Sequence, residues 1–257
     1  MGEIAGLIIA FFSFSFIASG VYILNDIRDI ENDKLHPVKK HRPFASGRVG
    51  VSTGMVMLVV LVVLGFSIAY QLDMNFLWLI ILYMIINAGY SFGLKSISVL
   101  DMLLVSSGFI IRIYMGGAVT GVPISQWLIM MIFLLSLFLV LGKRSDDLRI
   151  FEESGVSVRK SSLKYNKEFI NSSITMVSGV IIVTYMLYCV SPEVSERWGT
   201  NHLLITSIFV IAGIMRYLQL IFVEKRSESP VKVLFKDRFI FTVVLLWGIT
   251  FGLIIYF

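Results

Sequence analysis

Eight apolar segments, each about 20 residues long, limit what this chain can fold into. A helix of that length crosses the hydrocarbon core of a bilayer. The composition agrees, because 57% of the residues are hydrophobic and only 15% are charged. The short alternating strands of a membrane β-barrel are absent from the sequence. We therefore expect an all-α, polytopic membrane bundle with helices near 4–24, 54–71, 75–95, 98–119, 125–142, 168–190, 201–222 and 238–257.

Basic residues are distributed unevenly between these segments. Of the 22 Lys and Arg residues, 19 lie in the loops after the first, third, fifth and seventh spans. If the helices alternate in direction, the positive-inside rule makes that side cytoplasmic. We expect a multi-pass protein of the plasma membrane with its active site on the cytoplasmic side. The net charge of +5 reflects this topology and anionic partners, since no basic stripe with interleaved aromatics predicts nucleic-acid binding.

The sequence indicates one membrane domain over residues 1–257. Two cytoplasmic loops, at about 25–53 and 143–167, carry most of the chemically interesting residues. Loops this long in a compact protein are often functional. Cys189 is the only cysteine, so neither an intrachain disulfide nor a cysteine metal site can form. The oligomeric state is left open, a homo-oligomer included.

An acidic stretch follows the first span directly. If it is helical, Asp26, Asp29 and Asp33 lie at positions i, i+3 and i+7 and share one face. Neighbouring carboxylates repel one another unless a cation lies between them. Oxygen ligands suit Mg²⁺, which takes one or two carboxylates together with substrate phosphates. We predict a Mg²⁺ site with Asn25, Asp26, Asp29 and Asp33 as ligands.

Basic residues follow these acids in the same loop. Pro37 is expected to end the helix near His36 and to turn the chain back toward the acids. Lys39 and Arg42 then suit an anionic group bound beside the metal. The alternative interpretation is a solvated connector, which does not require three acids on one helical face at the membrane boundary.

The same loop resembles a known signature. The UbiA superfamily of membrane prenyltransferases has an aspartate-rich motif similar to Asn25-Asp26-x-x-Asp29-x-x-x-Asp33. Its decaprenyl-phosphate phosphoribosyltransferase branch resembles the continuation His36-Pro37-x-Lys39-x-x-Arg42-Pro43. Further similar pieces follow in order over most of the chain: Tyr90-Ser91-Phe92-Gly93-Leu94-Lys95, Val105-Ser106-Ser107, Arg112, Gly116-Gly117, Ser125-Gln126-Trp127 and Gly142-Lys143-Arg144. The family has nine spans, and residues 1–24 do not match its opening segment, so the first family helix is expected to be missing here.

The second loop distinguishes the branches. Ordinary UbiA-type enzymes carry a second aspartate-rich motif there for a prenyl diphosphate. This chain has instead Lys143-Arg144-Ser145-Asp146-Asp147, followed by Arg159-Lys160 and Tyr165. Cations at a helix end suit phosphate recognition, with Arg through paired donors and Lys as a point charge. The alternative is that Lys143 and Arg144 only mark a positive-inside stop after the fifth span.

Several polar residues lie in or at the ends of spans. Lys95 is either a snorkelling cation or a substrate contact, and Tyr90 either a belt residue or a substrate contact. Asp101 is near the cytoplasmic end of the fourth span and is a candidate for lining the site. Arg112 is expected to be an interhelical partner, and Arg216 to snorkel or pair.

The resemblance implies transfer of a 5-phosphoribosyl group from 5-phosphoribosyl 1-diphosphate to a polyprenyl phosphate such as decaprenyl phosphate. It also implies that diphosphate is released and that the product feeds cell-envelope arabinose synthesis. The expected catalytic residues are Asp29, Asp33 and Lys95. The expected substrate-binding residues are Lys39, Arg42, Tyr90, Lys143, Arg144, Asp147 and Tyr165.

Two other functions stay open from the sequence. One is a conventional UbiA-type prenyltransferase, with a prenyl diphosphate and an aromatic or glycerol-lipid acceptor. The other is a transporter with Asp101 and Arg112 on an ion path, which would place charges near mid-membrane. Most charges lie instead at the cytoplasmic surface, which disfavours the transporter.

Overall fold

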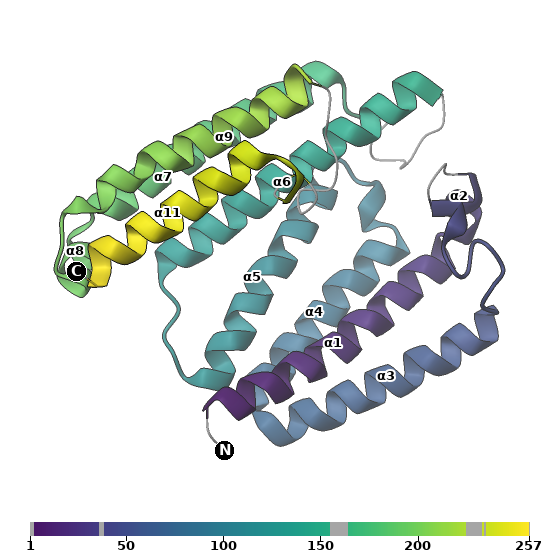
Figure 1. The fold of residues 1–257 in the computed structure, drawn as a ribbon. Coiled ribbons are helices and arrows are strands. Elements are labelled where there is room, and N and C mark those ends of the chain that lie inside the picture. The colour runs from purple at the N-terminus through teal and green to yellow at the C-terminus, as the bar shows by residue number, and fades with distance from the viewer. Residues whose placement is uncertain (1–2, 36–38, 155–163, 225–232, 234, 257) are drawn as a thin grey trace. The chain divides into compact units, whose positions relative to one another are not determined.

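A computed structural model describes residues 3–35, 39–154, 164–224, 233 and 235–256. Eight of the described helices are long and apolar enough to cross a membrane, which confirms the expected all-α membrane fold (Figure 1). The helices belong to two compact units. The first runs to Ser125 and includes Ser154 and Lys164, and the second comprises Gln126–Glu153 and the chain from Tyr165. The expectation of one domain over the whole chain stays a prediction.

In the first unit, the described residues form four membrane helices and three short elements. They are α1 (Glu3–Arg28), α2 (Ile30–Leu35), η1 (Lys39–His41), α3 (Val51–Leu72), α4 (Met74–Phe92), η2 (Leu94–Ser96) and α5 (Leu100–Thr120). The turn between α3 and α4 is short because Asp73 is extended and caps the next helix, its carboxylate accepting a hydrogen bond from the Phe76 amide at 2.9 Å. The short connection expected between the spans at 54–71 and 75–95 is therefore confirmed.

Helices α1 and α3 lie side by side in the first unit (Figure 1). Their contact depends on Gly65, where an added Cβ would lie 2.6 Å from Ile17 Cγ1 and 3.0 Å from the Ser13 carbonyl. The Ser13 hydroxyl donates a hydrogen bond to the Gly65 carbonyl at 2.8 Å. Small residues allow the two helices to approach closely. In lipid, where the hydrophobic effect does not drive helices together, such close packing is what stabilises their contact.

The second unit also contains four membrane helices. Its elements among the described residues are α6 (Gln126–Ser154), α7 (Lys167–Val190), α8 (Pro192–Trp198), η4 (His202–Thr206), α9 (Ser207–Phe222) and α11 (Arg238–Tyr256). Two of them differ from expectation. The fifth span continues as helix to Ser154 and does not end near residue 142. The connection between the spans expected at 168–190 and 201–222 contains the short helix α8. The basic residues expected to begin the second loop therefore lie on α6.

Buried polar contacts join three elements of the second unit. The Trp247 indole donates to the Tyr185 hydroxyl at 2.7 Å, and that hydroxyl lies 2.7 Å from Thr206 Oγ1. Tyr185 is on α7, Thr206 on η4 and Trp247 on α11. A hydrogen bond that satisfies groups away from water avoids the cost of leaving them unpaired. These contacts fix the packing of α7 and α11 at this end of the unit.

Candidate active site

The acidic segment continues the helical course of α1. Although α1 ends at Arg28, the Asp29 amide donates to the Asn25 carbonyl at 3.0 Å. The Asp33 amide in turn donates to the Asp29 carbonyl at 2.8 Å. This i to i+4 pattern is helical, so the expected helical spacing of the three aspartates is confirmed. The expected break at His36 and Pro37 lies outside the described residues.

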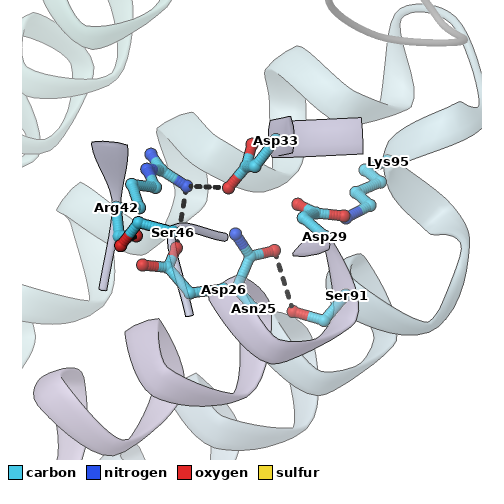
Figure 2. A network of polar contacts seen from close by, with 8 residues as sticks. All are labelled: Asn25, Asp26, Asp29, Asp33, Arg42, Ser46, Ser91 and Lys95. Carbon is cyan, nitrogen blue, oxygen red and sulfur yellow. Dashed lines mark hydrogen bonds and ion pairs between the residues drawn. The ribbon is translucent and has the colours of Figure 1, made fainter. Parts of the chain in front are cut away.

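Arg42 binds two of the three aspartates. Its Nη1 donates to Asp26 Oδ1 at 2.8 Å and to Asp33 Oδ2 at 2.9 Å (Figure 2). The position of Arg42 is set locally, because its amide donates to the Lys39 carbonyl in η1 at 2.9 Å. The Ser46 hydroxyl also donates to the Arg42 carbonyl, at 2.7 Å. The chain after η1 thus returns to α1 and α2 and places a guanidinium between two carboxylates.

The third aspartate is paired with a cation from another helix. The Lys95 ammonium donates to Asp29 Oδ1. Lys95 lies in η2, directly after Gly93, which ends α4 with a φ of +147°. Glycine adopts this backbone conformation without strain, whereas a residue with a Cβ atom would be strained there. The sharp turn at Gly93 therefore carries Lys95 toward the end of α1.

The fourth predicted ligand contacts a residue that the sequence did not single out. The Ser91 hydroxyl donates to Asn25 Oδ1 at 3.4 Å, and Ser91 is 4% exposed (Figure 2). Ser91 is on α4, next to the half-buried Tyr90. Its only signal in the sequence was its place in the Tyr90–Lys95 stretch. A buried hydroxyl that holds the Asn25 amide orients that side chain relative to the aspartates.

Each of the three carboxylates is paired with a protein cation in this arrangement. Among the described residues, no group of three or more His, Cys, Asp or Glu side chains is close enough to hold a metal ion. Asp26 and Asp33 nevertheless reach one and the same nitrogen of Arg42. Mg²⁺ commonly takes one or two carboxylates and completes its shell with water and phosphate oxygens. The Asp26 and Asp33 pair therefore fits a divalent cation, and the assignment of all four ligands stays a prediction.

The other predicted substrate-binding residues lie on the second unit. Lys143, Arg144 and Asp147 are all on α6. Arg144 is 2% exposed, and its Nη1 donates to Asp147 Oδ2 at 2.6 Å. Tyr165 is buried, and its ring stacks on Phe169 with the centroids 5.6 Å apart. Their roles in substrate binding stay predictions.

Two further expectations concern charges outside this cluster. Arg112 donates to the Tyr83 hydroxyl at 3.3 Å, and its guanidinium lies 5.3 Å from the centre of the Phe14 ring. It thus joins α5 to α4 and α1, which confirms the expected interhelical role. Arg216 pairs with Glu224 and Asp237, both at 2.7 Å, which confirms the expectation of pairing. Asp101 is fully buried in the first turn of α5, and the second-loop residues Arg159 and Lys160 lie outside the described residues.

Comparison with known proteins finds matches over almost the whole chain. A model of the UbiA prenyltransferase family matches residues 2–255. The chain belongs to this family. A decaprenyl-phosphate phosphoribosyltransferase from Mycolicibacterium smegmatis is 33% identical over 255 residues, covering 97% of this chain and 80% of that protein. A protein of the same name from Mycobacterium tuberculosis is 32% identical, covering 95% of this chain and 79% of that protein.

A solved structure is also similar in fold. It is that of a UbiA homologue from Archaeoglobus fulgidus bound to GPP and Mg²⁺. The TM-score is 0.70, with 17% sequence identity, over 99% of this chain and 88% of that one. The chain therefore shares the fold of that structure.

Proposed function

We propose that this transferase moves the 5-phosphoribosyl group of 5-phosphoribosyl 1-diphosphate to a polyprenyl phosphate, such as decaprenyl phosphate. An oxygen of the acceptor phosphate forms a bond to ribose C1 while the bond from C1 to the diphosphate oxygen breaks. Diphosphate leaves with the electron pair. The observation that carries the proposal is the 33% identity to a decaprenyl-phosphate phosphoribosyltransferase over 97% of the chain.

The cations around the aspartates support an anionic substrate. Arg42 and Lys95 lie within hydrogen-bond reach of the carboxylates, and their side chains are 37% and 23% exposed. A diphosphate bound at this point accepts hydrogen bonds from both, and the planar guanidinium offers paired donors to phosphate oxygens. Lys39, in η1, and Tyr90, on α4, are further candidates for contacts with the substrate. On the second unit, Lys143, Arg144, Asp147 and Tyr165 are candidates as well.

The residues act by positioning and by stabilising charge. Mg²⁺, when bound, neutralises charge on the departing diphosphate. The residues that would hold it are Asn25, Asp26, Asp29 and Asp33. Of these, we assign Asp29 and Asp33 to the catalytic step. Lys95 would hold the leaving group by a charge-assisted hydrogen bond. The acceptor phosphate is already an anion near neutral pH, so the site needs no strong general base.

The proposed location follows from the distribution of charge. The acids on α1 and α2 lie at the end of a span that the positive-inside rule assigns to the cytoplasm. A soluble phosphorylated donor is available on that side of the plasma membrane. The polyprenyl tail would stay in the bilayer, and the product would supply cell-envelope arabinose synthesis.

Radiolabelled donor tests the proposal. Membranes containing the protein are incubated with labelled 5-phosphoribosyl 1-diphosphate, decaprenyl phosphate and Mg²⁺, and the organic extract is analysed for lipid-linked phosphoribose. We expect labelled lipid that requires both the acceptor and Mg²⁺. The proposal is wrong if no lipid-linked phosphoribose forms. If the protein then uses a prenyl diphosphate with an aromatic or glycerol-lipid acceptor, it is a conventional prenyltransferase.

A further inference from the structure

Each aspartate of the candidate site already has a protein cation as its partner. Arg42 Nη1 is shared by Asp26 and Asp33, and Lys95 is paired with Asp29 (Figure 2). Three carboxylates therefore face at least two resident cations, Arg42 and Lys95. A free divalent cation would therefore have to compete with these resident cations for the carboxylates.

Arg42 lies where a metal bound to Asp26 and Asp33 would have to lie. The two carboxylate oxygens are 2.8 and 2.9 Å from the same nitrogen, so both point toward one location. Asp33 has only 5% of its side chain exposed, which limits its freedom to turn elsewhere. A free metal ion can bind between these two oxygens only if the guanidinium leaves. Arg42 then exchanges two charge-assisted hydrogen bonds to carboxylates for weaker contacts with water.

A bound diphosphate changes this balance. The Arg42 side chain is 37% exposed, so it has room to move toward an anion on the solvent side. Its guanidinium then exchanges two carboxylate partners for phosphate oxygens, which suit the paired donors of arginine equally well. The hydrogen bonds that Arg42 loses when a metal displaces it are therefore replaced only when a diphosphate is bound.

We propose that Arg42 is a resident counter-ion that keeps free divalent metal off the Asp26 and Asp33 pair until a diphosphate group takes its guanidinium. Metal and diphosphate then bind cooperatively, with Arg42 as the residue that couples them. This inference rests on the proposed metal and diphosphate site. It adds that the site rejects the metal alone.

Equilibrium dialysis tests the coupling without measuring turnover. Purified protein in detergent is dialysed against ⁵⁴Mn²⁺ alone, inorganic ³²P-diphosphate alone, or both, and the excess of each label on the protein side is counted. For the wild type we expect weak binding of Mn²⁺ alone, and affinity about 5- to 150-fold higher with diphosphate, the usual range for coupled ligands. Equal Mn²⁺ affinity with and without diphosphate would overturn the proposal.

The decisive variant is Arg42→Gln, which removes the charge between the two acids. We expect it to bind Mn²⁺ alone at least about tenfold more tightly than the wild type, and to lose most of the effect of diphosphate. Lys34→Gln is the matched control, because Lys34 is a cation on α2 beside Asp33 but pairs with the exposed Glu31 at 2.8 Å. It should behave as the wild type does. Arg42→Gln binding Mn²⁺ no more tightly than Lys34→Gln would refute the role of Arg42.

Two further variants separate this inference from the proposed function. Asp26→Asn with Asp33→Asn should abolish binding of Mn²⁺ in every condition. If Mn²⁺ and diphosphate bind and depend on these acids, but Arg42→Gln has no effect, the inference fails and the metal site stands. If the double variant binds as the wild type does, the metal site itself is wrong. Arg42→Met, which removes the same charge from the Asp26 and Asp33 pair, gives a second test with the same expected direction if Arg42→Gln does not fold.

Discussion

At the scale of single residues, the candidate site is a set of ion pairs between distant parts of the chain. Arg42 follows Asp26 by 16 positions, and Lys95 follows Asp29 by 66. The spacing of the aspartates was predictable, because it follows from helical geometry alone. The partner of each aspartate was not, because it depends on how the chain returns after η1 and on the turn at Gly93. Ser91, which contacts Asn25, was missed for the same reason.

Replacing Asp29 tests the residue proposed to act closest to the reaction. Asp29→Ala leaves Lys95 without its carboxylate and removes one oxygen ligand of the proposed metal site. We expect transfer of phosphoribose to fall at least about 100-fold, as for other losses of a charge-stabilising group. The assay is formation of labelled lipid, and circular dichroism reports whether the helices are retained.

A nearby acid provides the control for this substitution. Glu31 lies two residues further along, but its side chain is 84% exposed and pairs only with Lys34 among the contacts that the structure describes. Glu31→Ala should keep nearly full activity. Similar activity in Asp29→Ala and Glu31→Ala would show that Asp29 has no special role.

At the scale of elements, glycines and paired charges decide how neighbouring helices meet. Gly65 lets α3 approach Ile17 and Ser13 of α1 closely, which sets the position of the helix that carries the acids. In the second unit, Arg216 of α9 holds Asp237, the residue before α11. No sequence motif indicated the contact at Gly65 or the partner of Arg216. A glycine in an apolar helix and a charge near a helix end have many ordinary explanations, and only the packing identifies their partners.

Adding one methyl group at Gly65 tests the contact between α1 and α3. Gly65→Ala places Cβ within 2.6 Å of Ile17, so the helices must separate or the side chain must leave its rotamer. We expect a loss of stability of about 1 to 3 kcal/mol, the usual cost of overpacking. The measurement is the thermal unfolding midpoint in detergent. Gly116→Ala in α5 is the control, since nothing lies within 4 Å of the added atom. Equal midpoints for the two variants would contradict the packing argument.

The pair of Arg216 and Asp237 predicts a dependence of stability on pH. Hydrogen bonds from Arg216 hold the pKa of Asp237 below its ordinary value of 3.8. A pKa that is lower in the folded state stabilises the fold above pH 3.8, and this contribution is lost as the pH falls through the folded-state value. Asp237→Asn should therefore lower the unfolding midpoint at pH 7.

The difference between Asp237→Asn and the wild type should shrink when unfolding is measured below pH 3.8. Asparagine is also a good N-cap, so the variant keeps an acceptor for the Ile240 amide, which lies 2.9 Å from Asp237 Oδ1. The substitution thus tests the charge and preserves the cap. A difference that is independent of pH would assign the effect to something other than ionisation.

At the scale of the whole molecule, eight membrane helices place the acidic segment on one side of the bilayer. The alternation of the spans predicts that Lys40 is cytoplasmic and that Glu193, on α8, is external. Both side chains are exposed. With Cys189 replaced by Ala, Lys40→Cys and Glu193→Cys should react differently with a membrane-impermeant maleimide.

In intact cells, the maleimide should label Glu193→Cys and leave Lys40→Cys unlabelled until the membrane is permeabilised. Labelling of Lys40→Cys in intact cells would reverse the topology and remove the argument for a cytoplasmic donor. Labelling of both in permeabilised cells controls for the accessibility of each position.

The sequence by itself determined the membrane class, the number of spans and the helical spacing of the aspartates. These properties depend on local sequence. The length of an apolar segment decides whether it can span a bilayer, and the helical period decides which residues share a face. Only the tertiary structure decided that Arg42 lies between Asp26 and Asp33, that Lys95 meets Asp29, and that Arg144 is buried against Asp147. Each of these depends on the course of turns and on how far a helix continues. Turns and helix ends are set by packing between segments, and the pattern of charges along the chain does not specify them.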